Sequence, residues 1–129
     1  MPSSSVNYKS TITNDIGSTP TLIFGSEKSC SIESIWIVNT TQNSLFVDIT
    51  ILREIDNEPK STYIIRKLPI TAYGKQEIIN ANIQNNVGIS STPQAYYTLP
   101  GDTMFANSDF IQNRFECHVN YREFVETGV

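Results

Sequence analysis

The chain has 129 residues, a formal net charge of -4 and a sequence pI of about 4.8, and its longest run of cations is Arg66-Lys67. Nucleic acids and anionic membrane surfaces attract clustered cations, so this composition argues against either one as a direct partner. Apolar residues make up 39% of the chain and charged residues 17%. These proportions suit one domain of strands with neutral polar outer faces and do not suit disorder.

The first twenty residues are polar and include Pro2 and Pro20. We predict that residues 1–20 form an N-terminal arm or edge strand, with the strand at residues 6–12. Residues 21–129 are predicted to form a single domain. The first ten residues lack the apolar core of a signal peptide, and no segment approaches the roughly 18 apolar residues of a membrane-spanning helix. We therefore expect the protein to be made in a cytoplasm and kept there at first.

Residues 31–55 are the centre of the predicted fold, and we expect them to form a hairpin of two strands. Apolar and polar side chains alternate over residues 45–52, and a period of two indicates a strand with one buried face. Residues 35–38 are an unbroken apolar run, which is typical of a strand in the middle of a sheet. We expect Trp36, within that run, to lie in the core.

A polar turn is predicted at residues 39–44, where Asn, Thr, Gln and Ser can bond to their own backbone. The triplet Asn39-Thr40-Thr41 matches a glycosylation sequon. Because no secretion signal accompanies it, we interpret the triplet as turn chemistry.

The remaining elements are also strands and turns. Pro59 excludes a central strand at its position, and Pro100-Gly101 is typical of a type II turn, in which Gly supplies the positive φ. We predict a turn at residues 108–113 with Phe110 and Ile111 packed beneath it. Further strands are predicted at residues 21–24, 61–67, 75–80, 95–99, 103–107 and 114–124.

These strands define the expected fold class. No stretch of convincing length has helical periodicity, and short strands at hairpin spacing are typical of a sandwich or barrel. We predict an all-β fold, an antiparallel β-sandwich of about eight short strands that is either jelly-roll or Ig-like. The long polar segment at residues 81–94 is expected to be a functional loop or to contain a short element.

The sequence offers weak candidates for catalysis. Cys117 and His118 invite a nucleophile and base interpretation, but adjacent strand residues point to opposite faces. We therefore expect a buried thiol and a solvent-facing imidazole. Cys30 could pair with Cys117 only if their strands are neighbours.

The acidic residues offer no stronger candidate. Asp48, Asp56 and Glu58 form the best carboxylate group, and we expect them to be solvated residues at a hairpin end. Asp102, after Pro100-Gly101, is expected to bond to the backbone of its turn. The sequence has no metal-ligand spacing and no Gly-rich phosphate loop, so we predict no enzymatic activity, no catalytic residues, no metal and no cofactor.

Tyrosines could form a platform for stacking on a sugar. Tyr96, Tyr97 and Tyr73 would then lie together on one exposed face beside polar groups. Tyrosine is also a common strand residue and a common interface residue, which leaves the assignment open. A glycan-binding or adhesion module is therefore the alternative function.

From residue 20 to residue 124, the order of features resembles small β-sandwich virion proteins of tailed bacteriophages. The resemblance rests on an I-x-x-I-x-I-x-N strand at residues 32–39, an alternating strand at residues 45–52, Tyr63-Ile64-Ile65, a Gly-Asp-led strand from Gly101 and a closing alternating strand at residues 115–124. It implies a structural component of the virion without an active site, in the form of a head decoration, neck or tail accessory protein.

The resemblance also implies the partners. Such a protein would contact copies of itself and other virion proteins, whereas the charge pattern already argues against direct contact to nucleic acid or membrane. An arm can add a strand to the sheet edge of a neighbour, so we expect removal of residues 1–20 to reduce assembly and to leave melting unchanged.

Overall fold

The computed structural model describes residues 3–80 and 95–127. The described part contains strands and no helix, so the prediction of an all-β fold is confirmed, and it has no helix long and apolar enough to cross a membrane. The strands are β1 (Ser3–Ile16), β2 (Thr21–Gly25), β3 (Cys30–Asn39), β4 (Leu45–Ile55), β5 (Glu58–Ile70), β6 (Lys75–Asn80), β7 (Tyr96–Thr98), β8 (Thr103–Ser108) and β9 (Phe115–Thr127).

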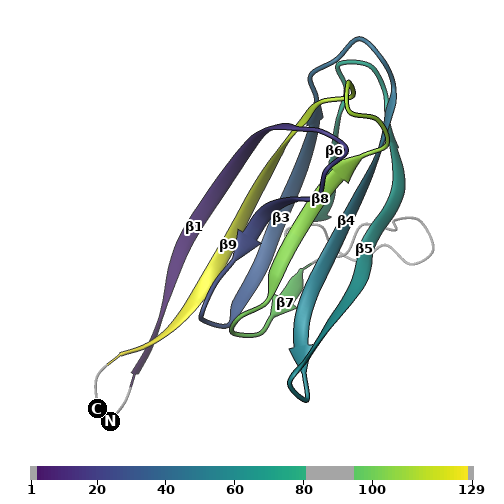
Figure 1. The fold of residues 1–129 in the computed structure, drawn as a ribbon. Helices are drawn as coiled ribbons and strands as arrows, with labels where there is room; N and C mark the ends of the chain where they lie inside the picture. Colours follow the sequence, from purple (N-terminus) through teal and green to yellow (C-terminus); the bar gives the residue numbers. More distant parts are fainter. Residues whose placement is uncertain (1–2, 81–94, 128–129) are drawn as a thin grey trace, which may run out of the picture.

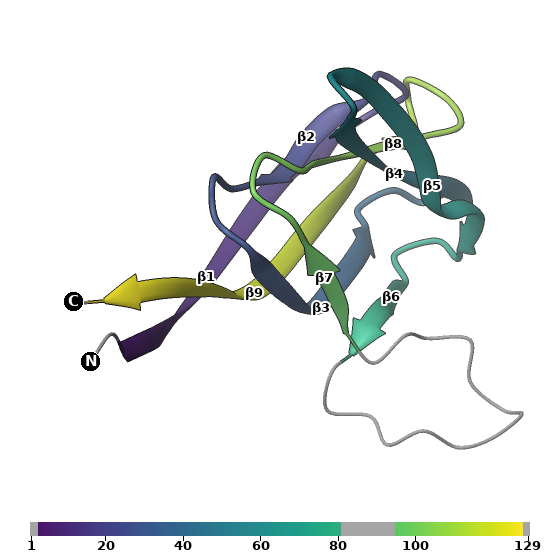
Figure 2. The same cartoon turned by 90° about the horizontal axis from the view of Figure 1, so that it is seen from below.

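The strands form two antiparallel sheets that pack face to face. Sheet A has the order β1-β9-β3-β6, with β7 also pairing with β3. Sheet B has the order β2-β8-β4-β5. Figure 1 shows the strands running along one common direction, and Figure 2, from below, shows the two layers. This arrangement is the predicted β-sandwich.

The pairing is nested about the middle of the chain. β4 pairs with β5, β3 pairs with β6 and β7, β2 pairs with β8, and β1 pairs with β9. The chain is thus one long antiparallel hairpin whose successive strand pairs lie in alternate sheets. The pairings of β3 with β9 and of β4 with β8 join these pairs within each sheet. Of the two predicted topologies, this nested order is the jelly roll.

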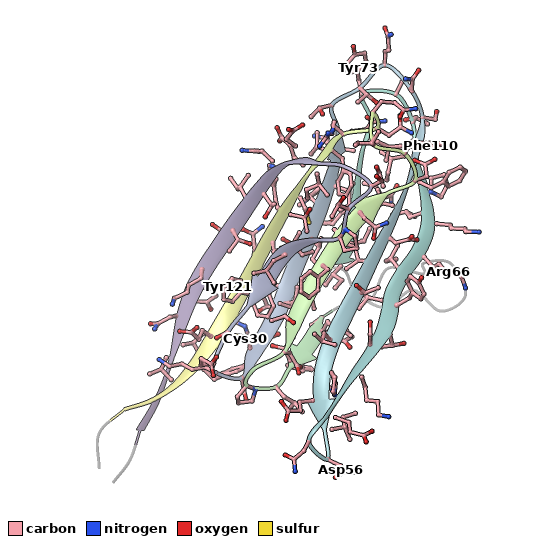
Figure 3. All side chains as sticks on the ribbon, viewed as in Figure 1. Cys30, Asp56, Arg66, Tyr73, Phe110 and Tyr121 are labelled. Atoms are coloured by element: carbon pink, nitrogen blue, oxygen red, sulfur yellow. The ribbon has the colours of Figure 1, made fainter. Side chains whose placement is uncertain are left out.

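The tip of the long hairpin is the turn between β4 and β5. Asp56 and Asn57 have φ values of 53° and 65°, and Ile55 pairs with Glu58 across the turn. Positive φ at both central residues is the type I′ geometry, whose twist matches that of the flanking strands. Figure 3 places Asp56 at one end of the molecule and Tyr73 at the other.

The core lies between the inner faces of the two sheets, and its largest contributions come from β3, β4 and β9. Alternate residues of β4 and β9 are buried as predicted, whereas the residues between them face outwards. Phe24 and Tyr121 meet edge to face, with ring centroids 4.8 Å apart. The buried members on β4 and β9 are Leu45, Val47, Ile49, Ile51, Phe115, Cys117, Val119 and Tyr121.

The predicted hairpin at residues 31–55 is wrong in its pairing. Both strands exist, but β3 belongs to sheet A and β4 to sheet B, so the turn at residues 40–44 carries the chain across the sandwich. Alternation shows which side of each strand is buried, and two facing strands satisfy that pattern as well as two paired ones.

Asn39 holds this crossing in place. Its side chain is 1% exposed, donates to the carbonyl oxygens of Asn43 (2.7 Å) and Thr71 (2.9 Å), and accepts from the backbone N–H and the hydroxyl of Thr41 (2.8 Å each). The interpretation of Asn39-Thr40-Thr41 as turn chemistry is confirmed, because the amide is buried and fully used.

Two predictions of packed side chains are wrong, namely Trp36 in the core and Phe110 and Ile111 beneath their turn. Trp36 points to the outer face of sheet A, where Lys75 Nζ lies 5.6 Å from its ring centroid. Phe110 and Ile111 are exposed in the turn between β8 and β9, and Figure 3 marks Phe110 near the edge of the molecule. The apolar run at residues 35–38 alternates between the two faces of a central strand, so only half of it enters the core.

The first described residues form the outermost strand of sheet A. β1 pairs with β9 from Ser3↔Thr127 to Ile16↔Phe115, and Ile16 is buried. Because β9 pairs with β3 only as far as Glu123, the far end of β1 and β9 is a two-stranded ribbon that extends past the sandwich (Figure 1). The predicted segment at residues 81–94 lies outside the described residues.

Candidate interaction surfaces

The outer face of sheet A carries a row of side chains that crosses four strands. Tyr8 lies opposite Arg122, Arg122 opposite Ser31, and Ser31 opposite Tyr97. Directly opposed residues of antiparallel strands share one face, so the two tyrosines mark the ends of one continuous row. Their side chains are 79% and 67% exposed.

Charge is balanced in the middle of this row. Arg122 forms an ion pair with Glu33, which also accepts a hydrogen bond from the Ser31 hydroxyl (3.1 Å). The guanidinium lies 5.7 Å from the ring centroid of Phe124, close enough for a cation–π contact. The centre of the row is therefore a compact polar cluster beside aromatic rings.

Apolar side chains accompany the row along the same face. Val6 pairs with Phe124 at the ribbon, and Ile12 pairs with His118 further along β1. We call the exposed apolar side chains of this surface the sheet A face, which consists of Val6, Tyr8, Ile12, Tyr97 and Phe124. Isolated exposed apolar residues are ordinary, whereas a group on one face is typical of a contact surface.

A buried carboxylate fastens β1 to the rest of sheet A. Glu123 accepts a hydrogen bond from the Ser26 hydroxyl (2.9 Å) and pairs with Lys9 (3.1 Å) and Lys28 (3.9 Å). The hydrogen bond from Lys9 is the main cause that lowers the pKa of Glu123, and the same contact raises the pKa of Lys9. The cluster joins β1, β9 and the loop before β3.

The outer face of sheet B is hollowed into two adjoining shallow grooves. The first, of about 490 Å³, is lined by the rings of Tyr63 and Phe105 and by polar side chains that include Asp48 and Asn107. The second, of about 560 Å³, shares Asp48 and Asn107. Aromatic rings beside a carboxylate and an amide can stack on an apolar face and bond to hydroxyl groups.

The structure separates the three tyrosines of the predicted glycan platform. Tyr97 lies on the outer face of sheet A, whereas Tyr96 packs against the core on the other side of β7. Tyr73, in the turn between β5 and β6, is at the opposite end of the sandwich (Figure 3). The platform of Tyr96, Tyr97 and Tyr73 is therefore wrong, because neighbouring strand residues point to opposite faces.

The predicted carboxylate group is not assembled either. Asp56 and Glu58 are exposed at the hairpin tip as expected, but Asp48 lies along β4, where it accepts a hydrogen bond from the Lys67 N–H (2.7 Å). Glu58 lies 3.4 Å from Lys60. Within residues 3–80 and 95–127, no three His, Cys, Asp or Glu side chains gather as metal ligands.

Cys117 and His118 lie as predicted. Cys117 is buried, and burial raises the pKa of its thiol to about 12. His118 points outwards, 3.3 Å from Glu116. Cys30 and Cys117 are on neighbouring strands, but Cys30 is opposite Glu123 and Cys117 is opposite Ile37. At about 3.3 Å per residue they lie on the order of 20 Å apart along the strand, so both stay free.

Asp102 has a role that the sequence analysis found only in part. It accepts a hydrogen bond from the Leu99 N–H (2.8 Å), which confirms its place in the turn with Gly101 at φ 88°. It also forms a two-pronged ion pair with Arg53 of β4, with Nη2–Oδ2 at 2.6 Å and Nε–Oδ1 at 3.0 Å. Nothing in the spacing of residues 53 and 102 indicates this contact, which follows from the pairing of β4 with β8.

Comparison with protein-family models, with curated proteins and with solved structures gave no match.

Proposed function

We propose that this protein is a non-enzymatic structural component of a bacteriophage particle, a head decoration, neck or tail accessory protein that acts through contacts between subunits. The sequence resemblance to small virion proteins supports this role, and the jelly roll is a fold that viral capsid proteins use. Because one fold hosts many functions, the proposal depends on the surface of the protein.

The sheet A face is the observation that carries the proposal. Its five apolar side chains lie on the outside of the sheet that ends in the β1–β9 ribbon. A surface of this kind, with a neutralised polar centre, can be covered by another subunit without leaving a buried charge unpaired. Repetition of such a contact builds closed symmetric assemblies.

The solution mass of the purified chain tests the proposal. We expect light scattering on a sizing column to give a defined oligomer, and the double variant Tyr97→Ser, Phe124→Ser to shift the mass towards the monomer. Phe46→Ser is the matched control, because the exposure of Phe46 lies between those of Phe124 and Tyr97 and the residue belongs to sheet B. An antibody against the chain should also label phage particles by electron microscopy. A monomer that labels no particle would contradict the proposal.

A glycan-binding or adhesion module is the second candidate, and the groove with Tyr63 and Phe105 favours it. Tyr63 is half-exposed, and Arg66 lies 5.1 Å from its ring centroid, so the ring is held but accessible. The groove, rather than the three tyrosines expected from the sequence, would hold the sugar.

A glycan array followed by calorimetry tests this candidate. If a glycan binds, Tyr63→Ala should lower its affinity about two- to ten-fold, as the loss of an aromatic contact predicts. Tyr73→Ala is the control, because that ring is 70% exposed at the far end of the molecule. The groove hypothesis would be contradicted if the protein bound no glycan, or if Tyr63→Ala and Tyr73→Ala lowered the affinity equally.

A further inference from the structure

β1 is the one edge strand in the described part of the sandwich that carries no evident protection against pairing. An edge strand presents unpaired backbone N–H and C=O groups, which natural proteins guard with proline, lysine, bulges or short length. β1 has 14 residues, contains no proline, and is irregular only between Thr13 and Ile16. Figure 1 shows β1 along the outer boundary of the molecule.

β5, the edge strand of sheet B on the side of the molecule away from β1, is protected against pairing with another strand. β5 has Pro59 and Pro69 near its two ends, and Lys67 has a φ of 53°. Its pairing with β4 shifts register on both sides of Ile49. Proline and irregular backbone interrupt a ladder, so β5 cannot offer a long regular edge.

The other edge strands of the described part are short, and β7, which pairs only with β3, has three residues. β2 has five residues, follows Pro20 and shifts its register between Leu22 and Phe24. β6 has six residues, begins with Lys75, and its partner strand shifts register between Ile35 and Trp36. None of these strands offers the regular length of β1.

The single lysine of β1 does not guard its edge either. Lys9 faces the inner side of sheet A, where its ammonium group pairs with Glu123 at 3.1 Å. The charge is therefore already neutralised within the subunit. From Val6 to Asn14, β1 presents no unpaired charge to an approaching strand.

We propose that the free edge of β1 pairs antiparallel with β1 of a second copy of this chain, so that the A sheets of two subunits join across a twofold axis at Ser10. This inference rests on the proposed function, in which the chain acts through subunit contacts. In this register Tyr8 of each copy lies opposite Ile12 of the other. The twofold axis therefore makes this contact two times, and it covers four exposed apolar side chains. A twofold contact requires such self-complementarity.

Neighbouring registers are less favourable. A twofold axis at Lys9 would place the two lysines opposite each other, which costs free energy as any opposed like charges do. An axis at Thr11 would place Ile12 against Ser10 and Tyr8 against Asn14, so apolar side chains would meet polar ones. The axis at Ser10 sets Lys9 opposite Thr11 and Tyr8 opposite Ile12, and of the exposed apolar side chains only Val6 meets a polar one, Asn14.

Disulfide trapping tests the register directly. Two Ser10→Cys thiols would be directly opposed across the axis, whereas the native Cys30 and Cys117 are buried and give no background. Ser61→Cys, at an exposed position of β5, is the matched control. Thiols held across an interface meet at an effective concentration on the order of millimolar, so at roughly 0.1 mM protein we expect Ser10→Cys to cross-link about ten-fold faster than the control.

A second variant distinguishes cross-linking through the β1–β1 contact from cross-linking through random collision of two chains. Adding Tyr8→Lys to Ser10→Cys places a charge against Ile12 of the other copy, and it should bring the cross-linking rate down to that of Ser61→Cys. Equal rates for Ser10→Cys and Ser61→Cys in the unmodified background would overturn the inference. If the wild-type chain is nevertheless a defined oligomer that Tyr97→Ser, Phe124→Ser dissociates, the proposed function stands and only the β1 contact is wrong.

Discussion

At the scale of single residues, Asn39 shows how one side chain can determine where the chain crosses between sheets. Its amide bonds to two segments, namely the turn that contains Thr41 and Asn43, and Thr71 directly after β5. A buried polar group of this kind is stabilising only while every partner is present. The Asn39 amide is thus the buried anchor of the crossing at residues 40–44, which backbone bonds from Thr40 to Arg114 and from Tyr73 to Thr41 also hold.

We predict that Asn39→Ala lowers the free energy of unfolding by about 2–3 kcal/mol, because the Thr41 N–H and the Thr71 carbonyl lose their partner while partly buried. Urea denaturation measures this change. Asn43→Ala is the control and should be nearly neutral, because the side chain of Asn43 is exposed and only its backbone carbonyl accepts the bond. Equal losses in the two variants would contradict the role of the Asn39 amide.

At the scale of elements, Glu123 links β1 to β9 and makes that link dependent on pH. Its pKa is lowered in the folded state, mainly by the hydrogen bond from Lys9. A lowered pKa means that the folded state favours the carboxylate, so its contribution is present above the unfolded pKa of about 4.3 and is lost as the pH falls through the folded pKa. The pKa of Lys9 is raised in the folded state, so the stability that its ammonium group contributes is lost as the pH rises through that pKa.

We predict that the stability difference between the wild-type chain and Glu123→Gln is greatest near neutral pH and shrinks as the pH falls below about 4. Urea midpoints of both proteins, measured at each pH, give the difference directly, and the titration of all other carboxylates cancels. Glu58→Gln is the control, since Glu58 is exposed at the hairpin tip and its pair with Lys60 is open to solvent. A difference that does not vary with pH would exclude the ionised carboxylate as the cause.

At the scale of the whole molecule, the sequence predicted the strands and their buried sides better than their partners. The alternation in β4 and β9 identified their core residues, and the turn at Pro100-Gly101 was recognised by composition. The hairpin at residues 31–55 failed because β3 and β4 lie in different sheets, where their buried sides face each other across the core. Periodicity indicates which side of a strand is apolar, but it does not indicate which neighbouring strand forms the backbone hydrogen bonds.

The grooves and the Asp102–Arg53 pair were beyond prediction for the same reason. Asp48 and Asn107 come together only because β4 pairs with β8, and Tyr63 joins them through β5. A side-chain site on a sheet face depends on strand order, and no local pattern encodes strand order in a nested topology.

The order of the strands also changes what removal of the N-terminal segment is expected to do. As the outer strand of sheet A, β1 protects the edge of β9 and buries Ile16. We now predict that deletion through Ile16 lowers the free energy of unfolding by several kcal/mol, because burial of one isoleucine alone is worth about 1.5–3 kcal/mol and a small domain has roughly 5–15 kcal/mol in total. Thermal melting followed by circular dichroism measures the loss.

Deletion through Ser5 is the matched control for that experiment. Residues 3–5 pair only with the end of β9 beyond Glu123, in the ribbon outside the four-strand part of sheet A. The shorter deletion should therefore melt close to the wild-type chain while the longer one melts lower or fails to fold. If the longer deletion melts like the wild type and only loses assembly, β1 belongs to a neighbouring subunit rather than to its own sandwich. The segment would then be the exchangeable arm that its sequence first suggested.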